Sequence, residues 1–221
     1  MKVELLTPGT VPYPEARSLQ LQIQDEIIRG ERGSTLILLE HPPVLTLGAG
    51  FHTENLLYSR EEYNRRGITI ETTERGGDIT YHAPGQLVIY PIFDLREMKT
   101  DLHWWLRSLE QIMIEALATF GLEGERVPPH TGIWLGSEKV CAIGIKVKRW
   151  VSIHGLALNC NCDLAPFGWI IPCGIVGKGV TSLSKALGRD VSTSDAIQPV
   201  LDSFTNTVGC EFSRSNAVSA S

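Results

Sequence analysis

The sequence lacks any apolar segment long enough to cross a membrane. A membrane-spanning helix needs roughly 20 apolar residues in succession, and no run in these 221 residues approaches that length. The first residues, MKVELLTPGTVPYPEA, show neither the apolar core of a secretory signal nor the arginine- and serine-rich composition of a transit peptide. We therefore expect a soluble, cytoplasmic protein with no membrane partner.

Cysteine is scarce, and its number is odd. Five cysteines without an export signal argue against a disulfide framework, which leaves a place in the core, a metal site or a nucleophile. Cys160 and Cys162 have one residue between them, whereas the paired ligands of structural zinc sites usually have two to four. His82 and His154 are the candidates to complete such a site, but no second cysteine pair exists, and we expect no metal.

Net positive charge is also missing. Twenty basic and 25 acidic residues give a net charge of −5, which makes a general nucleic-acid-binding protein a poor interpretation. The charge is unevenly distributed, however. Residues 126–190 contain eight basic groups against three acids, so this stretch is +5 and the remainder −10. A basic face in this half of the chain would attract an acidic protein partner.

The hydrophobic pattern predicts a mixed α+β (mixed α/β) single domain. Apolar residues recur at helical spacing over 15–29, 102–120 and 195–207, and Trp105 falls within the apolar stripe of the second segment. Strands are predicted at 35–39, 44–47, 68–72, 87–92, 131–135, 140–147 and 152–158, with the last two joined as a hairpin at 148–150. The expected domain covers residues 1–212, and the small, polar residues 213–221 are expected to form a disordered tail.

A glycine-rich segment is the densest group of polar residues. It reads Arg75-Gly76-Gly77-Asp78-Ile79-Thr80-Tyr81-His82-Ala83-Pro84-Gly85-Gln86. Two adjacent glycines allow the backbone to turn sharply and to approach a ligand closely. The glycine spacing fits neither the phosphate-binding loop nor the dinucleotide fingerprint. A plain β-hairpin with a Gly-Gly turn explains the pattern about as well as a binding site does.

Cys173 is the candidate nucleophile. It lies between Pro172 and Gly174 after an apolar run, where an irregular backbone suits a nucleophile better than a strand interior. A buried, inert thiol is the alternative, and it is our expectation for Cys141. A reactive thiolate needs a nearby cation or base, for which the candidates are Lys139, Lys146, Lys178, His82 and His154.

Taken together, three ordered motifs resemble those of the lipoyl(octanoyl) transferases. The pattern R-G-G-x-x-T-aromatic-H-x-x-G-Q-x-x-x-Y is met by Arg75, Gly76, Gly77, Thr80, Tyr81, His82, Gly85, Gln86 and Tyr90. A second block contains Lys139, Ile143-Gly144 and the run 154–159, and a third contains Asp163-Leu164, Phe167, Ile170, the run 172–175 and the run 181–183. The resemblance extends over roughly residues 30–208.

The resemblance implies an enzyme that moves an octanoyl or lipoyl group from acyl-carrier protein to a lysine of a lipoyl domain. Cys173 would be the acyl-accepting nucleophile and Lys139 its proton-transferring partner. Backbone N–H groups near Gly174 and the Gly76-Gly77 turn are candidates for an oxyanion hole. The acyl pocket would be lined by Arg75, Gly76, Gly77, Asp78, Ile79, Thr80, Tyr81, His82, Ala142, Ile143, Gly144, Gly155, Leu156 and Ala157.

The same resemblance implies the fold and the partners. Biotin and lipoate protein ligases share the family fold, a mixed β-sheet flanked by helices. The acceptors would be the lipoyl domains of 2-oxoacid dehydrogenase complexes and the glycine cleavage H protein. We expect a monomer that uses no cofactor and binds no nucleic acid.

Three other functions remain open from the sequence. An ATP-dependent lipoate or biotin ligase would have the same fold, but it would have to bind an adenylate and would not need Cys173. A non-catalytic protein that only binds acyl-carrier protein would form no acyl adduct. A metal-binding protein would use Cys160, Cys162 and His154.

Overall fold

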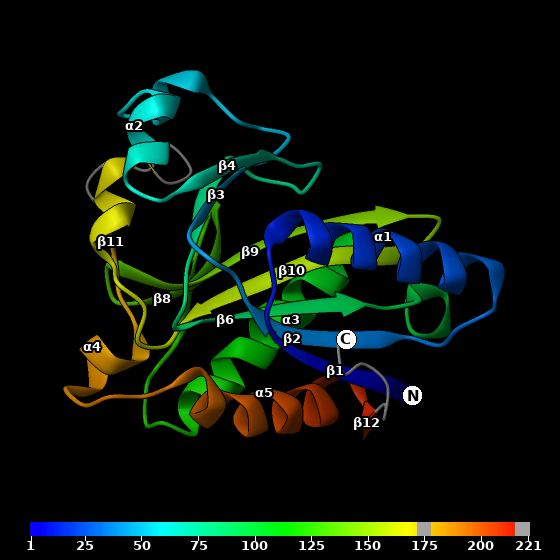
Figure 1. Ribbon diagram of the computed structural model, residues 1–221. Coiled ribbons are helices and arrows are strands. Elements are labelled where there is room, and N and C mark those ends of the chain that lie inside the picture. The colour runs from blue at the N-terminus through cyan, green and yellow to red at the C-terminus, as the bar shows by residue number, and fades with distance from the viewer. Residues whose placement is uncertain (172–177, 215–221) are drawn as a thin grey trace.

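The computed structural model describes residues 1–171 and 178–214. Within them, nine strands form one mixed sheet (Figure 1). Eight follow one path in the order β12 (Glu211–Arg214), β1 (Lys2–Thr10), β2 (Thr35–Glu40), β6 (Gln86–Ile92), β10 (Val151–Asn159), β9 (Glu138–Lys148), β8 (His130–Leu135) and β7 (Glu125–Val127). The ninth, β11 (Gly179–Val180), pairs in parallel with β9.

Both faces of the central strands are covered. In β2, Leu36 and Leu38 belong to one apolar cluster and Ile37 and Leu39 to another, because successive side chains of a strand point to opposite faces. The first face packs on α3 (Leu102–Ala118) and α5 (Thr193–Val208), and the second on α1 (Tyr13–Arg29). Figure 1 shows α1 on one side of the sheet and α3 and α5 on the other.

A second, smaller sheet lies beside α1, on the same side of the central sheet (Figure 1). Its strands are β4 (Thr69–Thr72), β3 (Val44–Leu47) and β5 (Ile79–His82), in that order. Together with η1 (Thr53–Asn55), α2 (Arg60–Arg65) and η3 (Ala165–Trp169) it forms the upper layer of Figure 1. Tyr63, Tyr81 and Phe167 are buried in its own apolar cluster. The remaining elements are η2 (Leu95–Glu97) and α4 (Leu183–Leu187).

The predicted fold class and most predicted elements are confirmed. The three helices, the strands of the central sheet and the hairpin between β9 and β10 all form, and Trp105 is fully buried. The last helix, α5, begins at Thr193 and contains Pro199 in its interior. Among the described residues no helix has the length and apolar character needed to cross a membrane.

The edge strand β12 and its neighbour β1 were not predicted. β1 pairs in parallel with both β2 and β12, so the first and last parts of the described chain lie together. The expected tail therefore begins too early, because Ser213 and Arg214 belong to β12 and are held by hydrogen bonding to β1. Residues 215–221, the rest of that predicted tail, lie outside the described residues.

Candidate active site

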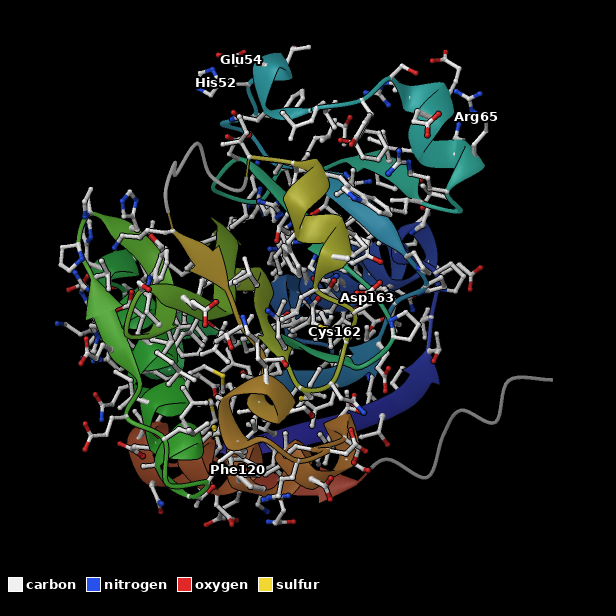
Figure 2. All side chains as sticks on the ribbon, turned by 90° about the vertical axis from the view of Figure 1, so that its left-hand side faces the viewer. His52, Glu54, Arg65, Phe120, Cys162 and Asp163 are labelled. Carbon is white, nitrogen blue, oxygen red and sulfur yellow. The ribbon has the colours of Figure 1, made fainter. Side chains whose placement is uncertain are left out.

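A cavity of about 480 Å³ lies between the central sheet and the smaller sheet. One wall comes from β9 and β10, and the opposite wall from β5 and the glycine-rich turn before it. The exposed His52 lies at its outer side, and Figure 2 shows this residue with Glu54 at the top of the molecule. Of the predicted pocket residues it brings together Arg75, Gly76, Gly77, Asp78, Ile79, Thr80, His82, Ala142, Ile143, Gly144, Gly155, Leu156 and Ala157, with Lys139 beside them.

Tyr81 is the exception among the predicted pocket residues. It is absent from the described lining of the cavity, because β5 alternates and turns this side chain toward the core of the smaller sheet. Its ring centroid lies 5.4 Å from that of Phe167, and burial raises the pKa of its phenol to about 12. Tyr81 thus stabilises the cavity wall by packing on the side of β5 that faces away from the cavity.

Small residues on two neighbouring strands make room for the cavity. The antiparallel register places Gly155 opposite Gly144 and Ala157 opposite Ala142. Larger side chains here would fill the space between the two sheets. A Cβ atom on Gly155 would also lie 2.1 Å from the Ile89 carbonyl oxygen, so glycine is required for β10 to approach β6.

Gly144 sets how closely the glycine-rich turn can approach β9. Gly76 N–H donates to the Ile145 carbonyl at 3.1 Å, and a Cβ on Gly144 would lie 2.8 Å from the Gly76 carbonyl oxygen. We expect Gly144→Ala to displace the turn and lower acyl transfer by about tenfold or more, because small displacements at a reacting site have large effects on rate. Steady-state kinetics against Gly33→Ala provides the comparison, since a Cβ on Gly33 meets nothing within 4 Å. Equal rates for the two variants would contradict the assigned role.

Two buried charged residues hold the glycine-rich turn. The Arg75 guanidinium donates to the Thr46 hydroxyl (2.9 and 3.2 Å), to the Thr46 carbonyl (2.6 Å) and to the Gly76 carbonyl (3.1 Å). The Asp78 carboxylate accepts hydrogen bonds from the His52 backbone N–H and the Asn55 side-chain amide. The Gly76 N–H of the turn that was a candidate for the oxyanion hole already donates to the Ile145 carbonyl of β9.

Lys139 lies where β9 begins and lines the cavity. Its Nζ donates to the Thr131 carbonyl at 3.0 Å and lies 4.9 Å from the centroid of the Trp134 ring. Lys178 approaches the same ring at 4.7 Å. The Thr181 N–H donates to the Lys139 carbonyl, so β11 and the residue after it are fixed to the strand that carries Lys139.

Cys173 lies outside the described residues, but the chain on both sides of segment 172–177 is described. On one side, the Ile171 N–H donates to the Asn55 carbonyl at 3.0 Å, and Ile170 forms a bridge with Leu56. On the other side, Val180 of β11 pairs with Lys139. The structure therefore anchors one flank of the segment at η1 and the other at β9, where Val180 and Lys139 both line the cavity.

The other four cysteines are buried. The expected burial of Cys141 is confirmed, and burial raises the pKa of the Cys141 and Cys162 thiols to about 12. Cys162 and the neighbouring Asp163 lie below η3 in Figure 2. Within the described part of the chain no three His, Cys, Asp or Glu side chains are arranged to hold a metal ion.

Hydrogen bonds connect the glycine-rich turn with the Lys139 strand. His82 Nδ1 and Gln86 Oε1 are 2.7 Å apart, and the Gln86 amide donates to Asn159 Oδ1 at 2.8 Å. The Asn159 amide in turn donates to the Thr181 carbonyl at 2.9 Å. Burial lowers the pKa of His82 to about 3, so the imidazole is neutral and donates from Nδ1. His82 therefore braces the cavity and is not a cation that could activate Cys173.

The basic stretch 126–190 does not present all its charge to solvent. Arg126 is paired with the buried Glu110 at 2.9 Å, Lys148 with Asp25 at 3.0 Å, and Lys185 with Glu138 at 2.8 Å. Three of its eight basic groups are therefore matched by carboxylates. The charge sum along the sequence overstates the positive charge of this part of the surface.

The sequence matches the family model described as the lipoyl protein ligase A/B catalytic domain over residues 12–205. The chain belongs to this family. An octanoyltransferase of Thermoanaerobacter sp. (strain X514) is 43% identical over 213 residues, which cover 96% of this chain and 92% of the relative. One of Gloeobacter violaceus is 47% identical over 211 residues, covering 95% and 88%. The resemblance inferred from the three motifs is confirmed.

Solved structures show the same fold in family members and in biotin ligases. The bi-partite lipoate protein ligase of Thermoplasma acidophilum has a TM-score of 0.70 at 16% identity, over 99% of this chain and 87% of that one. Lipoate-protein ligase A bound with ATP has a TM-score of 0.77 at 16% identity, over 99% and 90%. A biotin protein ligase of Aquifex aeolicus reaches 0.52 at 13% identity, over 94% and 68%. The predicted ligase-like architecture is confirmed.

Several residues that line the cavity were not predicted. Tyr13 reaches it from the start of α1, and His130 and Thr131 reach it from β8. Neither segment carries a motif, so only the packing of α1 and β8 against the sheet reveals them. Gln86 and Tyr90 also line the cavity; both belong to the first family motif, which was the available signal.

Proposed function

We propose that the protein is an octanoyltransferase that works through an acyl-enzyme on Cys173. The strongest support is the position of Lys139. It lines a mainly apolar cavity, and most of the other predicted motif residues line the same cavity. The donor would be octanoyl acyl-carrier protein and the acceptor a lysine of a lipoyl domain. We also propose that the enzyme acts as a monomer.

The chemistry requires two acyl transfers at one centre. The Cys173 thiolate attacks the thioester carbon of the donor, the carbon–sulfur bond to the carrier breaks, and the departing thiolate takes a proton from the Lys139 ammonium. The neutral amine of the acceptor lysine then attacks the new thioester. Lys139 accepts the proton that this nitrogen loses, and Cys173 leaves as thiolate. No cofactor enters the balance.

The cavity supplies the binding energy for the acyl chain. Burying about seven carbons at ~0.8 kcal/mol per methylene contributes roughly 5 kcal/mol. Because the walls are backbone-bonded strands, the site exists before the chain enters, and little ordering is needed on binding.

Intact-protein mass measurement after incubation with octanoyl acyl-carrier protein tests the covalent step. We expect a mass increase of one octanoyl group on the wild type and none on Cys173→Ser. Cys141→Ala is the matched control and should retain the adduct, because Cys141 is fully buried and its thiol has a raised pKa. An adduct of equal yield and turnover on Cys173→Ser would exclude the mechanism.

Two reaction mixtures test the ATP-dependent alternative, one with the thioester donor and one with free octanoate and ATP. The fold is shared with a ligase that binds ATP, so architecture does not separate the two activities. A transferase octanoylates a lipoyl domain from the thioester donor without ATP, whereas a ligase needs free octanoate and ATP. Product only in the second mixture would replace the proposed function by the ligase.

A further inference from the structure

His154 lies at the end of the cavity opposite Lys139. The cavity follows the paired strands β9 and β10, from Lys139 to Ile145 on one and from Asn159 to His154 on the other. The five residue-to-residue steps from Lys139 to Gly144 span about 17 Å at the usual strand rise. The Lys139 side chain extends sideways toward β8, where its Nζ contacts the Thr131 carbonyl. An acyl chain that starts beside Lys139 and lies over the small residues of β9 and β10 therefore runs toward His154.

An unusual backbone angle places His154 at the cavity. Ile153 packs toward α1, and Gly155 lines the cavity, so regular alternation would place His154 on the other face of the sheet. Its φ of 60° breaks the alternation, and the residue lines the cavity instead. Positive φ is uncommon for residues other than glycine and indicates a conformation that its surroundings impose.

The His154 side chain is buried, and both ring nitrogens are without a hydrogen bond to any described residue. Glu74 Oε1 lies 3.6 Å from Nε2, beyond ordinary hydrogen-bonding range, and the other carboxylate oxygen is bonded to Arg17. Gln20 Oε1 accepts a hydrogen bond from the His154 backbone N–H at 2.8 Å. The Gln20 Nε2 has no hydrogen-bond partner among the described residues. Buried polar groups are nearly always bonded, so these atoms mark a site for a polar group.

The kind of group follows from the charge state of the ring. Burial lowers the pKa of His154 to about 4, so at neutral pH the imidazole offers one donor and one acceptor. A hydroxyl also donates and accepts, and it matches both nitrogens. A carboxylate or an ammonium would match only one nitrogen and would lose its hydration in the cavity.

We propose that His154, which Gln20 holds through its backbone N–H, forms a polar subsite at the inner end of the acyl cavity that accepts a hydroxyl group on the terminal carbon of the acyl chain. The enzyme would then use an 8-hydroxyoctanoyl thioester in addition to an octanoyl thioester. The proposal rests on the proposed function, since it assumes that the chain enters this cavity from the Lys139 end.

The test is the ratio of kcat/KM for octanoyl and 8-hydroxyoctanoyl thioesters of the same pantetheine fragment. Both substrates are measured on one enzyme preparation, so a partly unfolded sample leaves the ratio unchanged. We expect a ratio within about threefold of one for the wild type. His154→Leu should raise it by about tenfold or more, because the hydroxyl is then buried without a partner.

Three further variants make the test specific. His154→Asn keeps a donor and an acceptor and tolerates positive φ, so its ratio should stay near that of the wild type. His103→Leu should not change the ratio, because His103 is exposed on α3 and does not line the described cavity. Should His154→Leu not fold, Gln20→Met replaces it and should raise the ratio by about threefold or more.

Two results would overturn the subsite: a wild-type ratio of about tenfold or more, or a folded His154→Leu variant with the wild-type ratio. A wild-type enzyme that transfers no octanoyl group would instead refute the proposed function, which keeps the two failures distinct.

Discussion

Replacing Lys139 by methionine is expected to lower octanoyl transfer by about three orders of magnitude, within the range for loss of a general acid–base group. Methionine keeps the length and the apolar stem of lysine but cannot hold or move a proton. Lys139 lines the cavity, and its Nζ is held by the Thr131 carbonyl. Steady-state kinetics with the thioester donor measures the loss, and circular dichroism verifies the fold.

Lys178→Met is the matched control for this prediction. Both ammonium groups lie within 5 Å of the Trp134 ring centroid, at 4.9 Å for Lys139 and 4.7 Å for Lys178. Lys178 is exposed and does not line the described cavity. We expect less than about threefold loss for it, as for a surface charge. The pH at which Cys173 reacts with an alkylating reagent at half its maximal rate should rise in Lys139→Met and stay unchanged in Lys178→Met. Equal losses in both variants would show that only positive charge near Trp134 matters.

Much of the fold could be predicted because local patterns determine the central elements. The apolar run of β2 and the helical stripe of α3 each indicate a single structure. β1 and β12 were missed because their stability comes from pairing with distant parts of the chain. β1 contains Pro8 and Gly9 within a largely exposed half, and such residues normally argue against a strand.

The site could be predicted as a set of segments but not as a shape. Motifs indicated Arg75–His82 and the two segments on β9 and β10, and the structure brings them to one cavity. Which residues face that cavity depends on strand register and alternation, which place Gly144 opposite Gly155 and turn Tyr81 away. The position of His154 depends on a single backbone angle. No sequence pattern predicts that angle.

The second large effect concerns stability in mild acid. We expect the free energy of unfolding to fall by about 4 kcal/mol between pH 7.5 and pH 5.5. Burial lowers the pKa of three histidines from the ordinary value of 6.5, to about 4 for His41, about 3 for His82 and about 4 for His154. All three are therefore neutral in the folded protein throughout this range.

The sign follows from proton binding by the two states. Below pH 6.5 the unfolded chain protonates these histidines and the folded chain does not, so acid favours unfolding. Each histidine then contributes about 1.4 kcal/mol of lost stability by pH 5.5. Carboxylates with lowered pKa, such as Asp94, act in the same direction only at lower pH, because an unfolded aspartate titrates near pH 3.9. The interval therefore isolates the histidines.

Urea unfolding at pH 7.5, 6.5 and 5.5 measures this dependence. His41→Gln removes one of the three groups, so the loss between pH 7.5 and 5.5 should shrink by about a third, to roughly 3 kcal/mol. The variant is less stable at every pH, because the contacts of His41 with the Val11 carbonyl and the Tyr90 hydroxyl are disturbed. His103→Gln, at an exposed position of α3, should leave the slope unchanged. A wild-type slope near zero would mean that these imidazoles are protonated when folded, and the neutral His82–Gln86 connection would then have to be abandoned.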